Sequence, residues 1–129
     1  DNLSVDDIPN TWNEMFKEWF AIEVPEDRLG CLQDIHWSMA AFGYFPTYTL
    51  GNLYAAQLLD AMGEELGDVD AIVESGNWQP MLDWLRGKIH QEGSKFTPSE
   101  LIQNATGKPP TPQPFINYVE KKYGELYNL

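Results

Sequence analysis

The residues best suited to chemistry lie within one short stretch of the chain. Gln33, Asp34, His36 and Trp37 place an amide, a carboxylate, an imidazole and an indole within five positions. An imidazole can exchange a proton near neutral pH, and a carboxylate beside it can fix which ring nitrogen carries that proton. A lone histidine among apolar residues is more often a packed core or capping residue, so the functional interpretation depends on these polar neighbours.

The spacing leaves two geometries open for this stretch. On a helix, Gln33, His36 and Trp37 share one face because they are three and four positions apart. On an extended segment, Asp34 and His36 share a face instead, and the carboxylate can orient the imidazole. The sequence does not choose between the two.

An aromatic loop follows. Gly43 precedes Tyr44, and Pro46 lies between Tyr44 and Tyr48. Phenol hydroxyls on such a loop can donate hydrogen bonds to a developing oxyanion. Packing of both rings on neighbouring helices, with the hydroxyls on water or backbone, explains the spacing equally well.

A metal site is not expected in this chain. The histidines are His36 and His90, and neither forms a closed zinc pattern with Cys31, which we expect to be a small buried apolar residue. An acidic group lacks the spacing of a calcium-binding loop and is predicted to be solvated surface; its members are Asp60, Glu64, Glu65, Asp68 and Asp70.

The elements that must position these groups are predicted to be helices, with no convincing strand. Apolar residues at helical spacing predict a helix that starts near Pro9 and ends at Val24–Pro25, and a second that stops near Gly63 and Gly67. Shorter helices are expected to carry Val69–Val73, Met81–Ile89, Leu101–Ala105 and Phe115–Leu126. Thr97 and Glu100 predict a capping box, Gly107 a helix C-terminus, and Pro109 to Pro114 a stiff extended connector.

Size and composition narrow the function classes. The 129 residues predict a single helical region over 1–129 with an aromatic-rich core. A net charge of −12 with eight Lys and Arg argues against binding to nucleic acid or to an anionic membrane. One cysteine favours a reducing compartment such as the cytoplasm. The chain begins without Met, which suggests a piece of something longer.

The motif itself resembles a known family. Gly30, Gln33, Asp34, His36 and Trp37 form the Gly-x-x-Gln-Asp-x-His-Trp signature of the Taq-type zinc metallocarboxypeptidases. Further segments resemble the same family, so the likeness covers essentially the whole chain; they are 42–57, 84–90, 96–101 and 118–127.

The resemblance implies the all-α, multi-helix C-terminal portion of a His-Glu-x-x-His metallopeptidase catalytic domain. Such enzymes are about four times longer, and their His-Glu-x-x-His zinc ligands, third-ligand glutamate motif and substrate-binding arginine motif do not occur here. The parent is expected to be a cytoplasmic, homodimeric carboxypeptidase that uses zinc to cleave peptides. The remainder of its catalytic domain is the expected partner of this chain, which alone should bind no zinc and be inactive.

Site roles follow from the same resemblance. In the similar thimet-type and oligoendopeptidase-type peptidases, a histidine and tyrosines from a Gly-Tyr loop face the zinc. By that analogy His36 and Tyr48, and next Tyr44, are the expected catalytic residues, contacting the oxyanion or the substrate.

Three further residues are expected at the substrate. Gln33 would contact the peptide backbone or its terminal carboxylate, Asp34 would orient its neighbours, and Trp37 would form the cleft wall.

A non-catalytic, acidic helical module that binds peptides or proteins is the competing hypothesis. A truncated chain should also expose an apolar patch; the residues expected to line it are Trp12, Trp37, Tyr44 and Tyr48.

Overall fold

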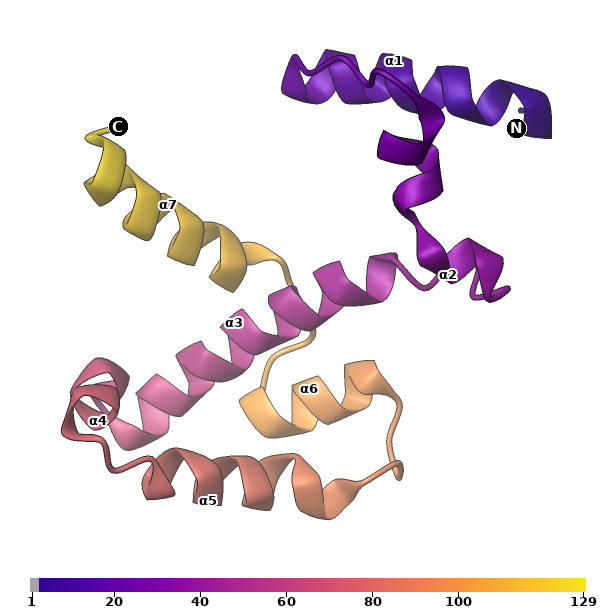
Figure 1. Cartoon of the computed structure of the whole chain (residues 1–129). Coiled ribbons are helices and arrows are strands. Elements are labelled where there is room, and N and C mark those ends of the chain that lie inside the picture. Colours follow the sequence, from indigo (N-terminus) through magenta and orange to yellow (C-terminus); the bar gives the residue numbers. More distant parts are fainter. Residues whose placement is uncertain (1–2) are drawn as a thin grey trace. The chain divides into compact units, whose positions relative to one another are not determined.

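The structure is a computed structural model that describes residues 3–129 (Figure 1). Helices and turns make up this part of the chain, which confirms the all-α prediction. The chain divides into two compact units, Asp1–Phe45 and Pro46–Leu129, here called unit 1 and unit 2. The single region over 1–129 stays a prediction, and its first two residues lie outside the described part.

Unit 1 is built on one amphipathic helix followed by short helical turns. Pro9 occupies the first turn of α1, where its missing N–H costs nothing, as predicted. The helix ends at Phe20, before the predicted Val24–Pro25, because Ala21 turns left-handed at a φ of 54° and donates to the carbonyl of Lys17. The elements of unit 1 are η1 (Val5–Asp7), α1 (Ile8–Phe20), η2 (Asp27–Leu29), η3 (Cys31–Gln33) and α2 (Ile35–Ser38).

Unit 2 is arranged around α3, the helix that the other α-helices of the unit contact (Figure 1). Its elements are α3 (Pro46–Leu66), α4 (Val69–Ser75), α5 (Gln79–Lys88), η4 (His90–Glu92), α6 (Pro98–Thr106) and α7 (Gln113–Tyr127). Ala61, Met62 and Trp84 form a buried apolar cluster between α3 and α5. α3 runs through Gly63 and ends before Gly67, whose φ of +87° suits only glycine.

The predicted capping box at the start of α6 and the predicted glycine at its end are both confirmed. The backbone N–H of Thr97 donates to the carboxylate of Glu100 (2.9 Å), and the N–H of Glu100 donates to Oγ1 of Thr97 (3.4 Å). Gly107 ends the helix at a φ of +74°. The connector that follows is shorter than predicted, because Pro112 already has helical angles (φ −74°, ψ −14°) and Pro114 lies in the first turn of α7.

The acidic group is exposed, which confirms the prediction of solvated surface, and three of its members also have polar partners. Glu64 pairs with Lys108 (3.0 Å), and Glu65 accepts from Lys88 (2.8 Å) and from the indole of Trp84 (3.0 Å). Asp68 caps α4 by accepting from the N–H of Ala71 (3.0 Å). The partners of Glu64 and Glu65 lie on other segments of the chain, so local spacing could not reveal them.

Within residues 3–129, every helix is too short or too polar to cross a lipid bilayer.

Candidate functional site

Asp34 and His36 form the centre of the candidate site in unit 1. Asp34 is extended (φ −77°, ψ 97°) and caps α2, its Oδ1 accepting from the backbone N–H of His36 at 2.8 Å. The same oxygen lies 2.9 Å from His36 Nδ1. The carboxylate therefore bonds both the start of the helix and the imidazole. Of the two geometries that the sequence left open, the structure has the one in which Asp34 orients the imidazole, although His36 itself lies on α2.

The imidazole is held on several sides. Its ring stacks on Tyr44 (centroids 4.9 Å apart, planes at 20°) and meets Phe45 edge to face (4.9 Å, 72°). The side chain of His36 is 17% exposed and that of Asp34 only 1%. Donation from Nδ1 to the carboxylate assigns the proton of the neutral ring to Nδ1 and leaves Nε2 as an acceptor atom.

Close packing explains the glycine of the motif. A Cβ atom on Gly30 would lie 2.6 Å from Val24 Cγ1, 3.1 Å from Asn13 Oδ1 and 3.5 Å from Trp12 Cδ1. The turn that leads to Asp34 can therefore pack against α1 only without a side chain at position 30. Cys31, next in sequence, is buried as predicted.

Gln33 has a structural contact inside the same turn. Its Nε2 donates to the carbonyl of Arg28, while its backbone N–H donates to the carbonyl of Gly30 (3.0 Å). The side chain lies on η3 and not on α2, so it does not share a helical face with His36 and Trp37. Its amide closes the loop that presents Asp34.

The aromatic loop folds back on α2. Trp37 is half-buried and its ring stacks on Phe42 (6.4 Å, 21°). The N–H of Ala41 donates to the carbonyl of His36 (2.9 Å), and Gly43 supplies the left-handed angle (φ +77°) before Tyr44. Local turns thus bring Tyr44 onto the imidazole.

Unit 1 gathers five of the six predicted site residues within one segment; they are Gln33, Asp34, His36, Trp37 and Tyr44. Tyr48 lies in the first turn of α3 in unit 2, with 55% of its surface exposed. Of the predicted patch, Tyr44 and Tyr48 are exposed, whereas Trp12 and Trp37 are half-buried. A continuous apolar patch stays a prediction.

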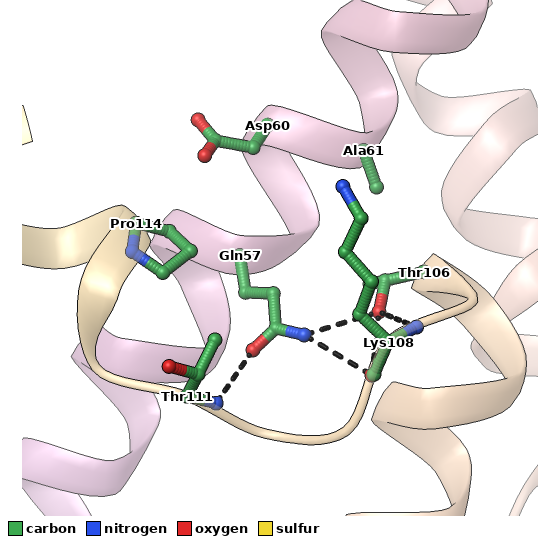
Figure 2. A pocket seen from close by; sticks show the side chains of 7 residues that line it. All are labelled: Gln57, Asp60, Ala61, Thr106, Lys108, Thr111 and Pro114. Atoms are coloured by element: carbon green, nitrogen blue, oxygen red, sulfur yellow. Dashed lines mark hydrogen bonds between the residues drawn. The ribbon is translucent and has the colours of Figure 1, made fainter. Parts of the chain in front are cut away.

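The sequence did not reveal the roles of two residues, one that packs on the imidazole and one that lines a cavity in unit 2. Phe45 packs its edge on the imidazole, and only its position next to Tyr44 hints at this. Gln57, from the middle of α3, is 3% exposed and lines a cavity of about 40 Å³ (Figure 2). An open groove of about 780 Å³ also lies in unit 2, between α3, α4 and α7.

A metal centre is not formed by the described residues. From residue 3 onward, no three His, Cys, Asp or Glu side chains gather closely enough to hold a metal ion.

The family model and the relatives that this chain matches are all named as carboxypeptidases. Residues 1–123 match the family model described as carboxypeptidase Taq (M32) metallopeptidase. Thermostable carboxypeptidase 1 of Thermus thermophilus is 46% identical over 125 residues, which is 97% of this chain and 24% of the relative. Carboxypeptidase 1 of Bacillus subtilis is 41% identical over 127 residues, or 98% and 25% of the two chains.

Solved structures agree with this likeness. The M32 carboxypeptidase from Deinococcus radiodurans R1 superposes with a TM-score of 0.91 at 34% identity, over 98% of this chain and 26% of that one. Trypanosoma cruzi metallocarboxypeptidase 1 superposes with a TM-score of 0.89 at 40% identity, over 95% and 26%. The chain thus spans about a quarter of the length of the relatives that it matches.

Proposed function

The chain belongs to the carboxypeptidase Taq (M32) metallopeptidase family, and from this premise we propose that it is the C-terminal part of the catalytic domain of a zinc-dependent metallocarboxypeptidase. The complete protein would remove residues from the C-termini of peptides. Residues 3–129 do not bring together a ligand set that fits a metal, so the zinc ligands would come from the rest of the protein.

The observation that carries the proposal is the hydrogen bond from His36 to Asp34. A carboxylate that fixes the imidazole tautomer is what a histidine needs in order to present one defined nitrogen to a substrate. Stacking on Tyr44 further restricts the ring. In this proposal His36 contacts the substrate or the oxyanion, and Asp34 orients it.

The other candidate residues would contact the substrate or line the site. Tyr48 and Tyr44 would offer phenol hydroxyls to the oxyanion, where preorganised donors stabilise developing charge. Gln33 would contact the peptide backbone or its terminal carboxylate through the part of its amide not bound to Arg28. Trp37, stacked on Phe42, would form the cleft wall.

Partners and location belong to the proposal as well. The remainder of the catalytic domain would cover apolar side chains that unit 1 exposes near the motif, among them Leu32 (67%), Ile35 (65%) and Phe42 (74%). The complete protein would act as a homodimer in the cytoplasm, where a free thiol such as Cys31 stays reduced.

The test uses the complete protein, loaded with metal, and the kcat/KM for a blocked dipeptide. His36→Gln should lower kcat/KM by about 100-fold or more, in the range found when one oxyanion donor is removed. His90→Gln is the matched control, because His90 is exposed on η4 in unit 2 and is not among the candidate site residues. Equal activity of the two variants would refute the role of His36.

The competing non-catalytic binding module is supported by the same exposed apolar side chains. The coding sequence upstream of residue 1 separates the two. A His-Glu-x-x-His helix there favours the enzyme, and an in-frame start codon directly before residue 1 favours the module.

A further inference from the structure

Gln57 is bound to a segment about fifty residues away in sequence. Its Nε2 donates to Thr106 Oγ1 (3.2 Å) and to the carbonyls of Lys108 (3.2 Å) and Pro109 (3.1 Å). Its Oε1 accepts from the backbone N–H of Thr111 (3.0 Å). Figure 2 shows the side chain reaching from α3 into the loop between α6 and α7.

The loop needs such a partner. Pro109, Pro110 and Pro112 have no N–H, so this segment is rich in acceptors and poor in donors. A side-chain amide carries both a donor and an acceptor group, and Gln57 uses both. Removing this amide breaks the hydrogen bonds that join α3 to the carbonyls of Lys108 and Pro109 and to the N–H of Thr111.

The geometry of α3 links this contact to the proposed site. Tyr48 lies nine residues before Gln57 on one uninterrupted helix. Nine residues turn a helix by about 900°, so the two side chains lie on opposite faces, about 13.5 Å apart along the axis. One face of α3 is thus fixed to the loop, and Tyr48 is on the other.

We propose that Gln57 is a positioning residue, which fixes the rotation and height of α3 and thereby sets the location of the Tyr48 phenol; this rests on the role proposed above for Tyr48. A rotation of about 10° moves an atom about 6 Å from the helix axis by about 1 Å. A misplacement of about 1 Å at a reacting group can cost about 100-fold in rate.

A double-mutant cycle in the complete, metal-loaded protein tests the proposal. The variants are Gln57→Met, Tyr48→Phe and the pair, and kcat and KM are measured for each. Gln57→Met should lower kcat about tenfold or more with a smaller change in KM, and should have little further effect once Tyr48 is Phe. Gln103→Met, at an exposed position on α6, should leave kcat unchanged.

A second variant and a spectroscopic probe test the same role of Gln57. Thr106→Val removes one acceptor of the Gln57 amide with little change in volume, and should give a weaker effect of the same kind if Gln57→Met does not fold. With fluorotyrosine at position 48, the ¹⁹F resonance should shift in both Gln57→Met and Thr106→Val.

The outcomes separate the two proposals. If Tyr48→Phe keeps full activity, the role of Tyr48 and this inference both fall. If Tyr48→Phe is impaired but the Gln57 and Tyr48 effects on kcat simply multiply, or the resonance does not move, Gln57 is structural only and this inference alone falls.

Discussion

Units 1 and 2 each contain one buried polar side chain among the described residues, and the two are used differently. Asp34 in unit 1 bonds a residue two positions away, whereas Gln57 in unit 2 bonds residues about fifty positions away. A local bond of this kind orients one chemical group. A long-range bond holds separate segments together, and unit 2 also has a buried apolar cluster, which includes Met62 and Trp84.

Asp34→Asn should sharpen this contrast most strongly. The amide can still accept from the backbone N–H of His36, but it no longer offers a carboxylate to the imidazole and can select the other tautomer. Loss of such an orienting group typically costs about 10- to 100-fold, so kcat/KM of the complete protein should fall by that amount.

Asp70→Asn is the control for Asp34→Asn, because it removes the same charge from an exposed site on α4. Steady-state kinetics on a blocked dipeptide should show its activity unchanged. Full activity of Asp34→Asn would mean that the carboxylate only caps α2.

Gly30→Ala tests whether unit 1 depends on close packing at one point. The added Cβ would meet Val24 Cγ1 at 2.6 Å, and overpacking of this kind costs about 1–3 kcal/mol. The same change at Gly51, inside α3 with open space around it, should instead stabilise by about 1 kcal/mol.

Urea unfolding of the complete protein measures both glycine variants. Shifts of opposite sign are expected in the midpoint. Equal shifts would show that the packing around Gly30 is loose.

The smallest expected effect is on the stability of unit 2 at acidic pH. Donation from the backbone N–H of Thr97 is the main cause that lowers the pKa of Glu100, and the ammonium of Lys88 lowers the pKa of Glu65. A depressed pKa in the folded state stabilises the fold above the ordinary value of 4.5, and this stabilisation is lost as the pH falls through the lower folded pKa.

The Glu100→Gln variant keeps an oxygen for the capping box but does not titrate. Its free energy of unfolding should therefore depend less on pH below 4.5 than that of the unsubstituted protein. Identical pH profiles would show that the capping carboxylate adds no acid sensitivity.

The helices were predictable because their signals are local. The apolar stripe of α3, the capping box at Thr97 and the left-handed Gly107 each lie within a few residues, and each is confirmed. The errors occur at ends: α1 stops early at Ala21, and α7 starts before the last proline of the connector.

The candidate site was predictable in composition but not in geometry. The residue types of Asp34 and His36 indicate a functional pair, yet their bond depends on a turn that is closed by Gln33 and packed at Gly30. The partners of Gln57 are about fifty residues away, and no spacing pattern connects them. Contacts that depend on how distant segments meet leave no local signal.

A crystal structure of the complete, metal-loaded protein with a bound peptide analogue would show directly whether His36 and Tyr48 contact the substrate. We expect His36, still bonded to Asp34 through Nδ1, to lie within hydrogen-bond distance of the analogue together with Tyr48. A structure in which the ring of His36 and the hydroxyl of Tyr48 both lie away from the analogue and the metal would contradict it.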